Sequence, residues 1–299
     1  MNHIHKNSAA LFSEEKHRAA NKSTWVSVVV NIFLTLAQVI GGFFANSQSL
    51  IADGLHSLSD LLSDFVVLVA SHKSKKDADE DHHYGHYRYE TAASLILGVM
   101  LVIVGVGMLW NVGHKIVGGI TVSQVQLYAL WIAIGTLIAK ELLFKYMLKI
   151  AHEVKSSMLA ANAWHARSDA ASSLVVVVGI IGSLVGYPIL DLIAALVVGL
   201  IIVRIGWNFS VDSLHDLMDR SLSVEENAKI IEIVKSVPGV LGYHDLRTRK
   251  MGDMILVDVH LEINGSITVK EGHNIAAEVE RRIMNSAAVL SVMTHIDPH

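Results

Sequence analysis

Six long apolar stretches constrain this chain more than any other feature of its sequence. They cover residues 24–45, 50–70, 91–112, 122–148, 157–185 and 189–209. As a helix rising 1.5 Å per residue, each is long enough to cross about 30 Å of hydrocarbon. The chain is 52% hydrophobic and only 17% charged, whereas a soluble protein carries about a quarter charged residues. The sequence therefore predicts an all-α, six-helix transmembrane domain over residues 24–209.

The basic residues predict how these helices cross the bilayer. The N-terminus, the second-to-third connection and the fourth-to-fifth region each carry four Lys or Arg, while the alternate loops offer only Lys115. By the positive-inside rule, both termini are then cytoplasmic. Residues 1–23 are polar and lack the apolar core of a signal peptide, so we expect a cytosolic tail. Metal binding by His3 and His5 in this tail is left open.

The last 90 residues have a different composition, with 14 acidic and 9 basic side chains. Helical periodicity falls on residues 223–237 and 269–284, and strand-like runs fall on 241–250, 254–263 and 289–295. We expect residues 210–299 to form a cytosolic α+β domain of order αββαβ. With a net charge of −4 and no extended basic face, the chain is not expected to bind nucleic acid.

Two of the predicted spans carry the same pair of ionisable residues. His56 and Asp60 lie in the second span, and His165 and Asp169 lie in the fifth. A spacing of four residues puts both side chains of each pair on one helix face. At 1.5 Å per residue, both pairs lie between about 9 and 18 Å from the surface at which their spans begin. Because the two spans run in opposite directions, the four side chains are expected to meet near the midplane.

This arrangement predicts a metal site. Ionisable residues inside a membrane are costly and usually functional, and two imidazoles with two carboxylates suit tetrahedral Zn²⁺. The chain has no cysteine, so nitrogen and oxygen are its only strong ligands. Hydrogen bonding between helices is the alternative, and the repeated spacing at matching depth argues against it. We expect such bonding of Asn31 and Gln38 instead, and the roles of Asp53 and Asp64 are left open.

Two further groups of possible ligands lie outside the spans. Asp79, His82 and His86 follow a D-x-x-H-x-x-x-H spacing, in which Gly85 permits a tight bend. A solvated acidic loop rich in histidine is the alternative for this segment. The cytosolic domain adds several histidines, most of them near strand ends, and a closing H-x-D; these are His244, His260, His273, His295 and Asp297. Surface histidines are the alternative here, and the H-x-D favours a metal site.

Taken together, these motifs resemble the cation diffusion facilitator family, especially its bacterial zinc and iron efflux branch. The resemblance runs from about Thr24 to His299 and rests on five segments in order: residues 49–60, 84–86, 164–169, 241–249 and 294–298.

The resemblance implies a homodimer of six-helix subunits in the bacterial inner membrane, with metallochaperone-like tails in contact. It implies a transport site at His56, Asp60, His165 and Asp169, and a loop site at Asp79, His82 and His86. For the tail it implies a binuclear site at His244, His260, His273, His295 and Asp297. It also implies that Arg88 pairs with Asp219 as a charge interlock.

One residue departs from this branch, which typically has Asp where this chain has His56. Imidazole there removes one negative charge and favours Zn²⁺ over Mn²⁺ or Fe²⁺, and Co²⁺, Cd²⁺ and Fe²⁺ stay open as alternatives. The predicted function is proton-coupled export of a divalent transition metal by alternating access. Metal and protons compete for the same ligand atoms, and histidine titrates in the useful range.

Three rival functions share some of these features. A metallohydrolase needs an open coordination position and a general base, which four protein ligands and the lack of an H-E-x-x-H motif disfavour. We therefore expect no enzyme activity. A non-transporting metal sensor or partner subunit of the same fold is the alternative, and uptake instead of export stays open.

Overall fold

The computed structural model describes residues 22, 25–74, 76, 78–118, 124–153, 157–252, 254–286 and 289–299. His3 and His5 lie outside them. The chain divides into two compact units, residues 1–64 with 99–207, and residues 65–98 with 208–299. Each unit is described by itself.

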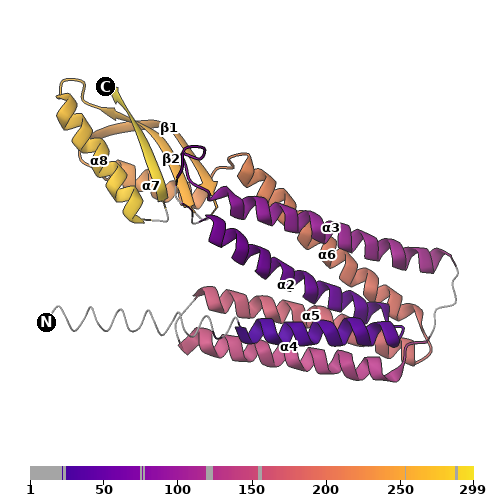
Figure 1. Ribbon diagram of the computed structural model, residues 1–299. Helices are drawn as coiled ribbons and strands as arrows, with labels where there is room; N and C mark the ends of the chain where they lie inside the picture. The colour runs from indigo at the N-terminus through magenta and orange to yellow at the C-terminus, as the bar shows by residue number, and fades with distance from the viewer. Residues whose placement is uncertain are drawn as a thin grey trace. The chain divides into compact units, whose positions relative to one another are not determined.

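Six long helices in the described part of the chain match the six predicted spans (Figure 1). Five are long and apolar enough to cross a membrane: Trp25–Phe44, α3 (Arg88–Val117), α4 (Leu127–Glu153), α5 (Ser157–Leu184, over its part Ala166–Leu184) and α6 (Ile189–Leu217). The other, α2 (Gln48–Ser74), has 27 residues and includes the predicted ligands His56 and Asp60. The predicted six-helix fold is confirmed. α3 and α6 extend beyond their predicted apolar stretches, 91–112 and 189–209.

In the first unit, small residues let the helices approach closely. α4 and α5 lie side by side (Figure 1). Between α5 and α6, a Cβ on Gly179 would lie 2.4 Å from the Cβ of Ala194. Ala129, Ala133 and Ile180 belong to the buried core of this unit. Such contacts replace the hydrophobic effect as the source of helix association in lipid.

Asp191, in the first turn of α6, caps the start of α2. Its carboxylate accepts from the Ser47 hydroxyl at 2.7 Å and from the backbone N–H of Gln48 at 2.6 Å, and Ser49 donates to it as well. The turn before α2 contains Asn46 with a φ of 57°, a conformation that Asn tolerates better than most residues. A carboxylate at a helix N-terminus satisfies free N–H groups and interacts well with the helix dipole.

The second unit contains the predicted αββαβ domain. Among the described residues its order is α7 (Val224–Lys235), β1 (Val240–Met251), β2 (Met254–Ile263), α8 (Val269–Ser286) and β3 (Val289–Pro298). The sheet order is β1-β2-β3, with β1 and β2 antiparallel and β2 and β3 parallel. A parallel pair needs a long crossover, and α8 supplies it. The α+β prediction is confirmed.

The two helices of this domain cover one face of its sheet. Val257, Val259 and Leu261 of β2 are buried in a core with Val234 of α7 and Val279 of α8. Successive side chains of a strand point to opposite faces. The residues between these, at 258, 260 and 262, therefore point to the face that the domain's own helices leave uncovered.

Candidate metal centres

Three of the four predicted intramembrane ligands come together in the first unit. His56 and Asp60 lie one turn apart on α2, and Asp169 lies on α5. One possible ligand atom from each lies within 4.8 Å of those of the other two. His56 Nε2 is 3.7 Å from Asp169 Oδ1, and the side chain of His56 is only 4% exposed. This is one imidazole with two carboxylates, in a spacing that a single divalent cation can bridge.

The side chain of His165 lies outside the described part of the chain, as does that of Asp64. The backbone at His165 is helical and lies one turn before Asp169 on α5. A helix places such a residue on the same face as Asp169. The structure thus brings His56, Asp60 and Asp169 together, and the backbone of His165 lies one helical turn from Asp169.

A buried ion pair near this group was missed from the sequence. Lys140 of α4 and Asp53 of α2 are 3% and 1% exposed, and Lys140 Nζ lies 3.4 Å from Asp53 Oδ1. Ser173 of α5 accepts from Lys140 at 2.8 Å and donates to Asp53 at 2.7 Å. Gln38 donates to Asp53 from the first helix, which confirms its predicted interhelical bond. The available signal was a lone lysine inside an apolar span.

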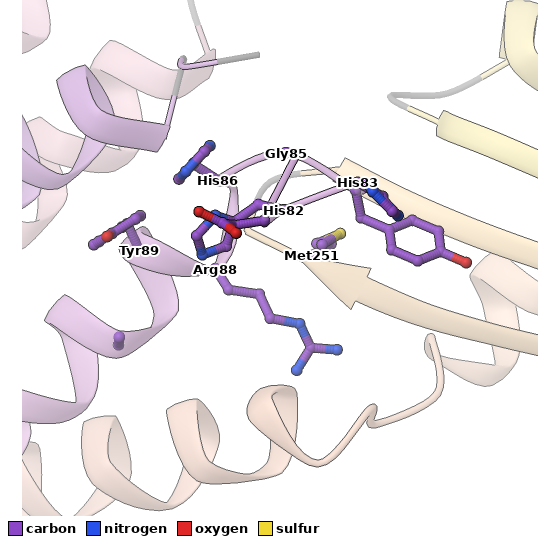
Figure 2. A pocket seen from close by; sticks show the side chains of 10 residues that line it. His82, His83, Gly85, His86, Arg88, Tyr89 and Met251 are labelled. Carbon is purple, nitrogen blue, oxygen red and sulfur yellow. The ribbon is translucent and has the colours of Figure 1, made fainter. Parts of the chain in front are cut away.

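The loop between α2 and α3 brings its three predicted ligands together. Asp79 Oδ1 lies 3.1 Å from His82 Nδ1, and Asp79 Oδ2 lies 3.4 Å from His86 Nε2. The bend is made at Gly85, with a φ of 79°, a conformation that glycine adopts at low cost. Figure 2 shows His83 on the far side of this bend from His86, so His83 does not join them.

A lysine already neutralises this loop group. Lys76 Nζ lies 2.6 Å from Asp79 Oδ2, and the ammonium holds the pKa of Asp79 well below its usual range, together with hydrogen bonds from His82. The carboxylate is therefore ionised at neutral pH. A divalent cation bound here would either share the Asp79 carboxylate with Lys76 or displace Lys76 from it.

Beside the loop, a cavity of about 550 Å³ is lined by residues 81–86, 88, 89 and 92 and by Met251 of β1 (Figure 2). Arg88, at the start of α3, contacts the carboxylate of Asp219 just after α6, and it also donates to the Leu217 carbonyl at 2.8 Å. The charge pair implied by the family resemblance is thus present in this unit.

In the tail domain, three histidines lie side by side across the sheet. His244 of β1 pairs in register with His260 of β2, and His260 pairs with His295 of β3. Their ring centroids are 5.0 Å and 4.6 Å apart. Neighbouring strands are about 4.8 Å apart, so the register alone puts these imidazoles next to one another on the uncovered face.

Asp297 joins the three histidines. One of its carboxylate oxygens lies 3.0 Å from His260 Nδ1 and 3.3 Å from His244 Nε2. The other lies 3.4 Å from His295 Nε2. His295 and Asp297 are two residues apart on β3, which places both on one face. The donor set of three imidazoles and a carboxylate fits a borderline divalent cation such as Zn²⁺.

Two acidic residues near this group were not foreseen. Glu262 Oε1 lies 3.1 Å from His244 Nδ1, and Asp245 forms a possible ligand group with His244 and His260. Asp245 lies at an irregularity in the β1–β2 pairing and has a φ of 48°. Such a bulge changes the direction in which side chains point. The spacing of residues in the sequence does not reveal where a bulge occurs.

His273 stands apart from these ligands. It is exposed on α8, whose buried residues pack in the core on the other face of the sheet. Within the described part of one chain, the possible metal-ligand groups do not include it.

Comparison with known proteins matches nearly the whole chain to two family models. Residues 24–218 match the cation efflux transmembrane domain, and residues 222–299 match the cytoplasmic domain of cation efflux proteins. The chain is 31% identical over 273 residues to the manganese efflux system protein MneS of Bacillus subtilis, covering 91% of this chain and 93% of that protein. It is 32% identical to the magnetosome protein MamB of Paramagnetospirillum magneticum, covering 87% of each chain.

Among solved structures, the metal-bound C-terminal domain of the CzcD transporter from Thermotoga maritima is similar at 20% identity. The match covers 25% of this chain and 88% of that chain, with a TM-score of 0.25.

Proposed function

The chain belongs to the cation diffusion facilitator family, whose members are metal transporters and not enzymes, and from this premise we propose that it exports Zn²⁺ in exchange for protons. It is an integral membrane protein. We place it in a bacterial inner membrane, as the family resemblance implies, and place both termini in the cytosol because of its basic loops. The proposed division is a tail at 1–23, a transport domain at 24–209 and a cytosolic domain at 210–299.

One observation carries the proposal: His56, Asp60 and Asp169 form a buried group on two membrane helices. A carboxylate inside a membrane is energetically costly, so its presence there usually marks a functional site. His165 is proposed as the fourth ligand, because its backbone lies one turn from Asp169. A site with four protein ligands suits a tetrahedral cation that is bound and released rather than used for catalysis.

Coupling to protons follows from ligand chemistry. Imidazole binds a metal only when its ring nitrogen is free of a proton, so the metal and protons compete for His56 and His165. In the proposed cycle, the metal enters from the cytosol and displaces protons. The helices then move so that the site faces outward, where protons displace the metal.

His56 is the reason to prefer Zn²⁺. An imidazole in place of a carboxylate favours a borderline cation over a hard one. Mn²⁺ is the second candidate, because one similar protein is named for manganese efflux. Fe²⁺, Co²⁺ and Cd²⁺ follow as further candidates.

The loop and tail groups are proposed as regulatory sites. Asp79, His82 and His86 would hold one cation in the loop. In the tail, His244, His260, His295 and Asp297 would hold metal on the face of the sheet that the domain's helices leave free. The proposed assembly is a homodimer, which the match to the family's cytoplasmic domain supports. His273 could then contribute if two chains bring it to a ligand group.

Zn²⁺ flux in proteoliposomes under an imposed pH gradient tests the proposal. Asp60→Ala and Asp169→Ala should abolish flux that depends on the gradient. Ser172→Ala is the matched control, since Ser172 is buried on α5 but donates only to the Asp169 backbone carbonyl. Transport at parental rates in both Asp variants would contradict the transport site. Metal binding without flux in the parent would favour the non-transporting sensor.

A further inference from the structure

The buried ion pair of Asp53 and Lys140 serves no purpose in binding the metal as proposed. Neither residue belongs to the intramembrane ligand group. Yet both charges lie in membrane helices, where an ionised side chain is retained only at a cost. A feature with that cost calls for a function of its own.

Its position along the helices is informative. Asp53 lies three residues before His56 on α2, and Ser173 lies four residues after Asp169 on α5. Because the two helices run in opposite directions, both displacements lead to the same side of the metal group. That side is where α2 begins and α5 ends. In the proposed topology it is the outer side.

The polar contacts of Asp53 connect four helices at this depth in the membrane. Asp53 of α2 receives hydrogen bonds from Gln38 of the first helix and Ser173 of α5, and it faces Lys140 of α4. All four residues are at most 3% exposed. If α2 moved away from α4 and α5 here, a carboxylate and an ammonium would lose their partners inside the protein, which is strongly unfavourable.

A second polar contact lies farther out on the same side. Asp191 at the start of α6 binds Ser47 and Ser49 at the start of α2, and all three are at most 1% exposed. The outer part of α2 is therefore attached at two successive levels, first to α6 and then to the first helix, α4 and α5.

We propose that Gln38, Asp53, Lys140 and Ser173 form an outer latch that closes the metal site toward the outside and must open during each transport cycle. The four residues act as positioning residues and not as metal ligands. The inference rests on the proposed function, since it assumes alternating access and the proposed orientation. The ion pair stabilises the arrangement in which the outer ends of the helices are together.

The absence of cysteine makes the latch directly testable. Thr136 lies one turn outward of Lys140 on α4, is 2% exposed, and donates to the Ile132 carbonyl of its own helix. A single Thr136→Cys in the full chain thus reports whether water reaches this level from outside. The measurement is its rate of labelling by a membrane-impermeant thiol reagent, applied in turn to each side of oriented membrane vesicles.

The latch is weakened in two ways on the Thr136→Cys background. The charge-neutral pair Asp53→Asn with Lys140→Met removes both charges together, so no single buried charge remains to unfold the protein. Ser173→Ala removes only the bridging hydroxyl. Ser172→Ala is its matched control, because both serines are buried and donate to the Asp169 carbonyl, but only Ser173 bonds to Asp53 and Lys140.

The latch predicts labelling from the outside at least about tenfold faster in the double variant, and a smaller increase in Ser173→Ala, as expected for a shifted two-state equilibrium. Ser172→Ala should label at the parental rate. Unchanged labelling in the double variant, or faster labelling only from the cytoplasmic side, would overturn the proposal. If the transport site itself were wrong, Asp169→Ala would still carry flux while these labelling rates could follow the prediction, so the two failures are distinguishable.

Discussion

The intramembrane group and the tail group use the same ligand types in opposite surroundings. His56 has a side chain that is 4% exposed, whereas that of His295 in the tail is 63% exposed. The first group lies among helices that must move before an ion can pass, and the second lies on an open sheet face. Solvent can therefore equilibrate with the tail group without any motion of the domain. The contrast suits transport in the first region and sensing in the second.

The largest expected effect is on Zn²⁺ flux. One isosteric substitution in each region tests whether the two regions have different roles. Asp169→Asn should lower Zn²⁺ flux at least about 100-fold, because an amide replaces a charged ligand in a buried site. Asp297→Asn should lower metal binding by the tail and leave maximal flux within a few-fold of the parent. Flux in proteoliposomes and calorimetric Zn²⁺ titration measure the two outcomes. Equal loss of flux in both variants would break the division of roles.

Next in size is the effect on selectivity. His56→Asp restores the residue typical of the similar branch and adds one hard oxygen ligand. The ratio of Mn²⁺ flux to Zn²⁺ flux should rise on the order of tenfold. A competition series across Zn²⁺, Cd²⁺, Co²⁺, Fe²⁺ and Mn²⁺ provides the measurement, with His260→Asp in the tail as control. Unchanged selectivity in His56→Asp would remove the reason for preferring Zn²⁺.

A smaller effect is expected from a glycine in the tail. A Cβ on Gly242 would lie 2.2 Å from Glu262 Oε2, so Gly242→Ala should push this carboxylate away from His244. Zn²⁺ affinity of the tail should fall by about tenfold, as for loss of a supporting contact, with no change in maximal flux. Gly265→Ala is the control, since its Cβ would meet Pro298 at 3.2 Å. Equal affinities in both variants would exclude a role for Glu262.

The smallest effect concerns the covered face of the tail. Arg281 and Arg282 lower the pKa of Glu278 from 4.5 to about 2. Its ionised form therefore adds stability above about pH 4.5, and this is lost as the pH falls toward about 2. Glu278→Gln should flatten the acid dependence of tail unfolding slightly, because its side chain is 31% exposed and solvent screens its ion pairs, and should leave Zn²⁺ binding at neutral pH unchanged. Chemical unfolding between pH 2 and 6 tests this.

Much of this molecule could be predicted because its signals are local. Spans long enough to cross a bilayer, the strand and helix periods of the tail, and the bend at Gly85 each depend on a short run of residues. The prediction that Gln38 bonds between helices was also correct, whereas Asn31, for which the same was predicted, donates to Ser27 of its own helix at 3.5 Å. The ion pair of Asp53 with Lys140 was missed because 87 residues separate its members, and nothing near either residue identifies the other.

Local spacing alone establishes which ligands share a face. A spacing of four residues on a helix places His56 above Asp60 whatever the rest of the chain does, and a spacing of two places His295 beside Asp297 on a strand. Only the tertiary structure decided which faces meet. It brought Asp169 to His56, set His244, His260 and His295 in register, and left His273 on the other side of the tail domain. Partners distant in sequence are chosen by packing and strand pairing, and no local pattern encodes that choice.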